Sequence, residues 1–293
     1  MLHYKLSGNT QVMHTILTLI IYLGLCLNGY SWGQTGHRVI GALAERHLTP
    51  TATKTVRSIL HGHKLQDVAN WADEIRSDQQ TLYKSFNKWH FMQAQSPESI
   101  QEIINTQQWP TDIQEAIVYC IDMLKKQPEE AKLQRAVLLK MLVHLVGDAH
   151  QPLHVGNPND RGATHCYVRW FYSKFPTTLH KIWDSKLIDA QHYSYTEYTD
   201  YLDHISKEDT KAWQQASIQQ WLKESRAYHD DVYPINTKTK QIDYCTHDRK
   251  TLAYENIPSL GYKYSYQMRP IMEQRLQQAG IRLAGVLNKL FDN

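Results

Sequence analysis

The chain has 293 residues, of which 42% are hydrophobic and 21% are charged, and its formal net charge is +3 with histidine neutral. This nearly balanced charge excludes a protein that holds nucleic acid by overall positive charge alone, so any anionic substrate must be attracted locally. The sequence contains no repeat, low-complexity tract or block of like charge, and we therefore expect one domain.

The first 31 residues have the features of a signal peptide. A polar start precedes an apolar run at residues 16–27, and Gly29 and Ser31 then form the small-x-small pattern of a cleavage site. The run is too short for a comfortable membrane span. Bulky Leu25 before Cys26 disfavours a lipid anchor. We therefore expect cleavage after Ser31, a mature domain of residues 32–293, no membrane span after cleavage, and export to the periplasm or secretion.

Export leaves three cysteines in a compartment that permits disulfides: Cys120, Cys166 and Cys245. Because the number is odd, at most one intramolecular bridge can form. The sequence does not indicate which two cysteines pair, or whether any do.

Trp32 would become the first residue of the mature chain. Its free α-amine and neighbouring carbonyl could chelate a metal, and His37 follows within the first turns of a predicted helix. An ordinary helix start with glycines for close packing is the competing interpretation of this segment. Thr49 and Pro50 then form an N-cap and first helical position, which predicts a helix that closes near Gly62.

Residues 65–78 have apolar positions at helical spacing, which predicts one helix. Asp73 lies on or beside that apolar stripe, and Arg76 is three residues later. A surface salt bridge between these two is the simplest interpretation. His90 follows between Trp89 and Phe91. Further helices are predicted from Ser96-Pro97-Glu98 onward and over residues 112–126.

The long apolar helix predicted over residues 134–150 carries His144 and Asp148, and Pro152 ends it. His154 follows. A second helix, over residues 179–189, carries His180 and Asp184. A spacing of four stacks the two side chains of each pair on one helical face, so one cation can be bound by both.

Both pairs lie among Leu, Val, Ile and Trp residues, where an unpaired imidazole or carboxylate is costly to bury. Any one of these histidines is more often a satisfied core residue than a ligand. Two H-x3-D pairs with a histidine between them favour a metal site.

The segment between the two pairs is rich in Gly, Asn and Pro, with alternation at residues 167–171 that predicts a loop and a small hairpin. Helical patterns return over residues 195–229 and from Tyr266 to Phe291. This last helix carries no ligand candidate, so we expect it to be scaffold. The predicted fold is all-α.

The assembled motifs resemble those of the S1/P1 nuclease family, whose members share an all-α fold with zinc-dependent phospholipase C. The resemblance covers essentially the mature chain. It is carried by the following motifs: W-x4-H at Trp32 and His37, WAD-x2-R at Asp73 and Arg76, WHF at His90 and Phe91, H-x3-D-x5-H at His144, Asp148 and His154, and H-x3-D at His180 and Asp184.

The resemblance implies three Zn2+ ions per chain. Asp73, His90, His144 and Asp148 would hold the first. Asp148 would bridge to the second, which His37 and the amine and carbonyl of Trp32 complete. The third would be held by His154, His180 and Asp184, with positions left open for water and substrate. Nitrogen and oxygen ligands without a thiolate suit Zn2+ in an oxidising compartment.

The resemblance also implies a function, the hydrolysis of single-stranded DNA and RNA to 5′-nucleotides, with activity on 3′-nucleotides. A hydroxide between two zinc ions, oriented by Asp73, would attack phosphorus, and Arg76 would neutralise charge. Phe91 would stack on a base. Thr164 stands where relatives commonly carry Asn, which changes a polar substrate contact. His150 and His165 match no ligand position and are expected to be structural or surface residues.

Two alternatives use the same residues. A phospholipase C would carry the same metals, but needs a site for a quaternary ammonium and a surface that meets lipid. A zinc-binding protein without catalysis is the second. Arg76, Phe91 and the open third zinc position favour the nuclease, and no stable protein partner is implied.

Overall fold

The structure is a computed structural model that describes residues 32–78, 81–103, 108–127 and 133–292. The predicted signal peptide, residues 1–31, lies outside this part of the chain. The longer helices are α2 (Gln34–Arg46), α3 (Pro50–Ile59), α7 (Ile113–Lys126), α8 (Arg135–Ala149), α11 (Tyr195–Leu202), α12 (Lys207–Gln215), α13 (Ile218–Ala227) and α15 (Tyr262–Phe291).

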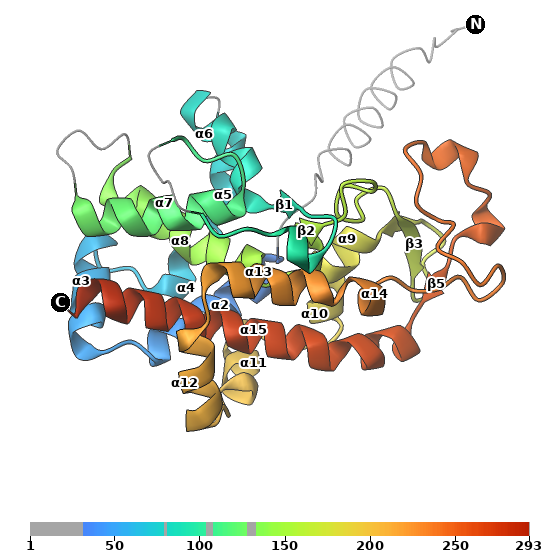
Figure 1. Ribbon diagram of the computed structural model, residues 1–293. Helices are drawn as coiled ribbons and strands as arrows, with labels where there is room; N and C mark the ends of the chain where they lie inside the picture. Colours follow the sequence, from blue (N-terminus) through green and yellow to red (C-terminus); the bar gives the residue numbers. More distant parts are fainter. Residues whose placement is uncertain (1–31, 79–80, 104–107, 128–132, 293) are drawn as a thin grey trace, which may run out of the picture.

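Shorter helical segments connect them. They are α4 (Leu65–Val68), α5 (Trp71–Glu74), α6 (Thr81–Ser85), α9 (Leu179–Lys181), α10 (Leu187–Asp189), α14 (His229–Val232), the 3-10 turns η1 (Ile75–Ser77), η2 (Phe86–His90), η3 (Pro97–Ser99), η4 (Pro152–His154), η6 (Arg249–Thr251) and η7 (Tyr254–Asn256), and the π-helical turn η5 (Ile182–Lys186). The all-α prediction is confirmed (Figure 1). Among the described residues, no helix combines the length and apolar character that a membrane span requires.

The longest helix, α15, is the scaffold of the fold. It packs along α2 and also contacts α8 and α3 (Figure 1). Leu276 and Leu283 of α15 and Leu43 of α2 are fully buried, and burying each such side chain contributes roughly 1.5–3 kcal/mol. The helix begins at Tyr262, earlier than the predicted start at Tyr266.

Two buried arginines of α15 anchor the C-terminal end of α8. Nε of Arg275 donates to the carbonyl of His150 (3.1 Å), and Nη1 of Arg282 donates to Nε2 of the same histidine (3.0 Å). Glu224 accepts hydrogen bonds from both guanidinium groups and balances their charge in part. His150 is therefore structural, as expected, and α15 fixes the helix end at which Asp148 lies.

Residues 65–78 do not form the single predicted helix, but α4, α5 and η1 in succession. In an uninterrupted helix the carbonyl of Ala69 would accept from the amide of Asp73. That amide instead donates to the carbonyl of Asn70 (3.1 Å). The break leaves the Ala69 carbonyl available to His144 of α8, whose Nδ1 lies 2.8 Å away.

The helix predicted from Ser96 onward is also wrong, because only the turn η3 forms. The chain turns inward directly afterwards at Ile100, whose side chain is buried and whose carbonyl accepts from Gln219 of α13 (2.8 Å). Tertiary burial at Ile100 thus overrides the local helix-start signal of Ser96 and Pro97.

The strands are short, and β1 and β2 adjoin residues of the candidate site. Strand β1 (Met92–Gln93) runs parallel to β2 (Val155–Gly156), which places Phe91 beside His154. The predicted hairpin is confirmed: β3 (Tyr167–Trp170) pairs antiparallel with β4 (Thr177–Thr178), and β5 (Ser259–Leu260) adds to β3 in parallel. A disulfide joins Cys166 to Cys245, while Cys120 is a buried free thiol.

Candidate metal centre

Asp148, near the C-terminal end of α8, lies at the centre of a buried group of histidines. Its Oδ2 is 3.1 Å from Nδ1 of His90 and 3.2 Å from Nε2 of His144. Its Oδ1 is 3.3 Å from Nε2 of His37. Because the two carboxylate oxygens face different histidines, Asp148 is placed to bridge two cations.

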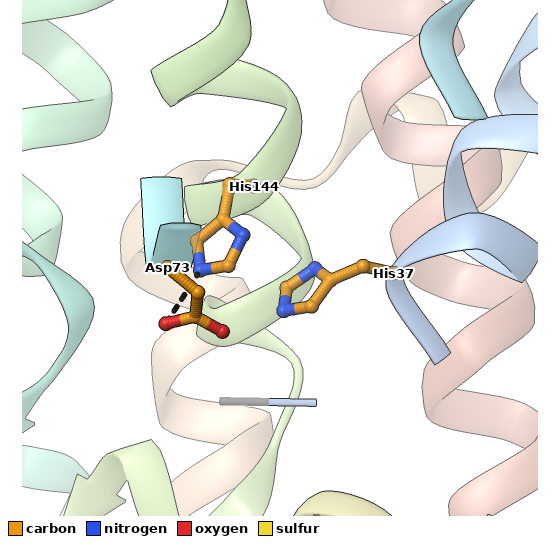
Figure 2. A group of neighbouring side chains, drawn as sticks. All are labelled: His37, Asp73 and His144. Atoms are coloured by element: carbon orange, nitrogen blue, oxygen red, sulfur yellow. Dashed lines mark ion pairs between the residues drawn. The ribbon is translucent and has the colours of Figure 1, made fainter. Parts of the chain in front are cut away.

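Asp73 of α5 adds a second carboxylate to this group. Its Oδ1 is 3.9 Å from both Nδ1 of His90 and Nε2 of His144, and Nη1 of Arg76 donates to it at 3.4 Å. Figure 2 shows His37, Asp73 and His144 converging from three helices. The predicted pairing of Asp73 with Arg76 is therefore present, but it lies beside the histidines and not on an isolated surface.

The approach of His37 depends on a glycine of the neighbouring helix. A Cβ atom at Gly147 of α8 would lie 2.8 Å from Nδ1 of His37, a distance that real Cβ contacts do not adopt. With glycine there, the His37 ring stacks on that of His144, with centroids 3.9 Å apart and planes 17° from parallel. Gly147 thus allows α2 to bring its histidine to Asp148.

A third group of ligand atoms comes from η4 and from the helical segment α9–η5. Nε2 of His154 is 3.4 Å from Oδ1 of Asp184, and Nε2 of His180 is 3.3 Å from Oδ2. The H-x3-D spacing brings His180 and Asp184 together here, although the helix takes a π-turn at Asp184. Gln151, which the sequence did not single out, donates from Nε2 to Oδ1 of Asp184 (2.7 Å) and is fully buried.

Backbone carbonyls orient three of the rings. Nδ1 of His144 lies 2.8 Å from the Ala69 oxygen, Nδ1 of His154 lies 2.7 Å from the His90 oxygen, and Nδ1 of His180 lies 2.7 Å from the Gly162 oxygen. A ring nitrogen that donates to a carbonyl leaves the opposite nitrogen with its lone pair. Histidine ligands of metals are typically held in this way.

Trp32 lies at the edge of the same site. Its side chain is fully buried, and the amide of the next residue, Gly33, donates to the carbonyl of Asp184. The start of α2 is therefore tied to the third group. Ligation by a free amine at Trp32 belongs to a chain cleaved after Ser31, and it stays a prediction.

The donor atoms fit divalent cations. Within the described chain, Oδ1 of Asp148, Nε2 of His154 and Oδ2 of Asp184 are buried and take part in no hydrogen bond. Leaving such atoms unsatisfied is costly, and a metal removes that cost. The atoms of each of these sets converge closely enough to hold one ion: His37, Asp73 and His144; His90, His144 and Asp148; His154, His180 and Asp184.

A further convergence, of Asp160 with Cys166 and Cys245, is not a metal site. The two sulfur atoms are joined in a disulfide, so neither can act as a thiolate ligand.

Burial and neighbouring charges set the protonation of the candidate ligands in the metal-free protein. Burial lowers the pKa of His37 to about 4, so its ring is neutral. Burial also opposes charge on His154, but Asp148 and Asp184 outweigh it and raise the pKa to about 9. Burial would raise the pKa of Asp148, yet His144 and His154 hold it well below its usual range. A metal ion would replace the proton of His154.

A cavity of about 410 Å³ opens onto the candidate ligands His90, His154 and His180. Phe91, Arg76 and Thr164 line it as well, and the Phe91 side chain is 41% exposed. The structure therefore brings the residues predicted for substrate contact close to the predicted metal ligands. Arg161 and His165 line the same cavity, which was not predicted from the sequence. They lie in a loop rich in Gly, Asn and Pro, and such a loop has no periodic pattern that indicates where its side chains point.

A larger cavity of about 680 Å³ is lined by Asp73 and Asp184. Its other acidic lining residues include Glu74 and Asp189, with Lys181 as a counter-charge. This lining is less suited to a polyanion than the smaller cavity, which carries arginines.

Comparisons with known proteins identify a family and several relatives. The sequence model of the S1/P1 Nuclease family matches residues 32–292. Endonuclease 2 of Arabidopsis thaliana is 26% identical, over 97% of this chain and 99% of its own. Endonuclease 5 of the same plant is 27% identical over 94% of each chain. Nuclease S1 of Aspergillus oryzae (strain ATCC 42149 / RIB 40) is 27% identical over 91% of this chain and 94% of its own.

Proposed function

Because the chain belongs to the S1/P1 nuclease family, we propose that it is a zinc-dependent endonuclease that hydrolyses phosphodiester bonds of single-stranded DNA and RNA to 5′-nucleotides. The observation that carries this proposal is the position of Asp148, which has His90 and His144 on one oxygen and His37 on the other. A third group, at His154, His180 and Asp184, lies where the substrate cavity opens.

We assign three zinc ions to these residues. The first would be held by Asp73, His90, His144 and Asp148; the second by Asp148, His37 and the main-chain amine and carbonyl of Trp32; the third by His154, His180 and Asp184. Bound zinc would lower the pKa of a coordinated water toward neutrality and polarise a phosphoryl oxygen.

The chain's own residues position the substrate around that chemistry. Asp73 can accept a hydrogen bond from the attacking water, and its pairing with Arg76 at 3.4 Å holds the guanidinium at the same place. Arg76 is 31% exposed at its side chain and lines the cavity, so it can donate to a phosphate oxygen as negative charge develops.

Single strands are the proposed substrate because Phe91 offers an exposed ring beside a metal ligand. A base must leave the duplex to stack there, and any base has a face that can stack. Activity on 3′-nucleotides belongs to the same proposal, because it needs one base and one phosphate. Thr164 lines the cavity in place of Asn, although its hydroxyl donates to the Arg161 carbonyl (3.0 Å) and not into the cavity.

Replacing Phe91 by alanine is expected to weaken productive binding of single-stranded DNA by about 1–3 kcal/mol, because one base loses its stacking partner. The effect should be in KM more than in kcat, since the metal ligands are unchanged. Steady-state kinetics on an oligonucleotide measures it. Phe175→Ala is the matched control, because Phe175 is 83% exposed and outside the cavity lining; equal KM values in the two variants would contradict the stacking role.

The deciding assay compares the cleaved, zinc-loaded protein on single-stranded DNA, double-stranded DNA and phosphatidylcholine. We expect acid-soluble nucleotides from the single strand first. Hydrolysis of lipid alone would make the protein a phospholipase C. Stable zinc binding with no turnover of any of the three would make it a zinc-binding protein without catalysis.

We also propose that residues 1–31 are a signal peptide, that residues 32–293 form the exported enzyme, and that it acts in the periplasm or outside the cell. A form that retains residues before Trp32 is expected to lose affinity for one zinc, because an amide replaces the amine. Metal analysis and turnover of this form, beside a cleaved form tagged at the C-terminus, measure the effect. Equal zinc content and equal activity would remove Trp32 from the ligand set.

A further inference from the structure

The loop between β2 and β3 has a left-handed backbone at three successive residues. Arg161, Gly162 and Ala163 have φ values of 54°, 63° and 63°. Glycine adopts this region freely, whereas an L-residue with a Cβ loses roughly 1–2 kcal/mol there. Arg161 and Ala163 are thus held in a conformation that their side chains disfavour, and the surrounding contacts must maintain it.

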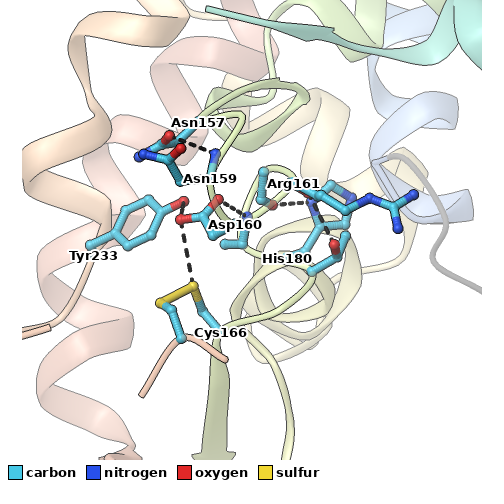
Figure 3. The surroundings of a disulfide bond; sticks show 11 residues. Asn157, Asn159, Asp160, Arg161, Cys166, His180 and Tyr233 are labelled. Atoms are coloured by element: carbon cyan, nitrogen blue, oxygen red, sulfur yellow. Dashed lines mark hydrogen bonds between the residues drawn. A yellow bond between two sulfur atoms is a disulfide. The ribbon is translucent and has the colours of Figure 1, made fainter. Parts of the chain in front are cut away.

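The contacts that hold the loop come from Asp160 and from close packing. Oδ1 of Asp160 accepts from the Ala163 amide (2.8 Å), and Oδ2 accepts from the Tyr233 hydroxyl (2.8 Å). A Cβ at Gly162 would lie 2.3 Å from the Leu153 oxygen, so the loop lies directly on the chain that carries His154. Figure 3 shows Asp160 beside Tyr233, with the disulfide of Cys166 below them.

The fixed loop presents two of its residues to the substrate cavity. The Gly162 carbonyl accepts a hydrogen bond from Nδ1 of His180 (2.7 Å). Arg161 therefore directly precedes a residue that is hydrogen-bonded to a proposed metal ligand. Arg161 and His165 both line the cavity that contains Arg76 and Phe91. The Arg161 residue is exposed, and Figure 3 draws no hydrogen bond from its guanidinium to the other residues shown.

A strained, exposed arginine in a cavity that already holds Arg76 favours a ligand with a second negative charge. We propose that Arg161 and His165 form a subsite for a second phosphate of the polynucleotide, next to the phosphodiester on which Arg76 acts. This inference rests on the proposed nuclease function and extends it. With such a subsite, the enzyme would cleave a substrate with two phosphates more efficiently than a substrate with one.

The subsite is tested with two substrates that differ by one phosphate. The dinucleoside monophosphate d(TpT) has only the scissile phosphate, whereas d(TpTpT) has a second. In Arg161→Gln, kcat/KM for d(TpTpT) is expected to fall roughly ten- to a hundredfold, as for loss of a charge-assisted hydrogen bond, with less than about a twofold change for d(TpT) and unchanged zinc content. His165→Ala should act in the same direction with a smaller loss.

Two further variants separate the effect of the lost charge from any effect on the loop conformation. Arg161→Gly removes the side chain while easing the positive φ, so it should reproduce Arg161→Gln, and Arg161→Lys should recover most of the loss. Arg169→Gln is the matched control, because Arg169 pairs with the Tyr254 hydroxyl (3.0 Å) outside the cavity lining. With a longer single strand, the salt dependence of kcat/KM should become shallower by about 0.7 in log–log slope for the one lost phosphate contact.

The outcomes are distinct. An equal loss on d(TpT) and d(TpTpT), or no loss on either, would overturn the subsite while the nuclease function stands. A wild-type enzyme that cuts neither substrate nor single-stranded DNA would overturn both. A loss confined to d(TpTpT) and restored by lysine would establish the subsite.

Discussion

Replacing Asp148 by asparagine is expected to lower turnover of single-stranded DNA by more than about a hundredfold. Replacing a residue that only hydrogen-bonds to a metal ligand already costs about 10–100-fold in metal affinity or activity. Asp148 is expected to matter more, because its own oxygens face the site: one faces His37, and the other faces His90 and His144. An amide has no negative charge and only one good donor oxygen, so it cannot bridge two cations.

The measurement pairs metal content with kinetics on one preparation. We expect Asp148→Asn to lose zinc from the shared pair of sites while His154, His180 and Asp184 retain theirs. Asp122→Asn serves as the control, because Asp122 forms an ion pair with the exposed Lys126 on α7 and belongs to none of the candidate metal groups of the described residues. Near-normal turnover of Asp148→Asn with a full complement of zinc would refute the bridging assignment.

The sequence predicted those parts of the site that depend on local periodicity. His144 and Asp148 are four apart on a regular helix, and their side chains are 3.2 Å apart. His180 and Asp184 converge equally well at 3.3 Å. The family resemblance supplied the residues from other segments, and the structure brings His37, Asp73 and His90 to the same carboxylate. Their roles as ligands stay predictions.

What the sequence could not predict depends on where backbone groups point. The helical spacing of residues 65–78 indicated one helix, yet a break at Ala69 turns a carbonyl toward His144. Gln151 resembles any polar residue after a helix until its bond to Asp184 is seen. Arg161 lies in a loop whose left-handed turn is fixed by Asp160 and by packing against Leu153. Apart from the local bond between Asp160 and the Ala163 amide, these are contacts between segments distant in the sequence, and no local pattern encodes them.

Removing the metal is expected to abolish activity and to lower the melting temperature by on the order of 10 °C. Even one site held at free zinc a thousand times its Kd contributes about 4 kcal/mol to stability. Without metal, the buried oxygens Oδ1 of Asp148 and Oδ2 of Asp184 make no hydrogen bond among the described residues. Stability and activity should both return when zinc is added back, as melting curves and kinetics on the same sample would report.

The stabilisation by zinc should also grow between about pH 6 and about pH 9. Burial opposes charge on His154, but Asp148 and Asp184 raise its pKa to about 9 in the metal-free protein, above the value of about 6.5 in an unfolded chain. The proton of His154 therefore stabilises the metal-free fold fully below about pH 6.5, and that contribution is lost as the pH rises through about 9. Zinc must displace this proton, so its affinity rises over the same interval. Melting temperatures with zinc and with chelator, measured at both pH values, test this; a difference that stays constant or narrows at the higher pH would show that His154 does not exchange its proton for the metal.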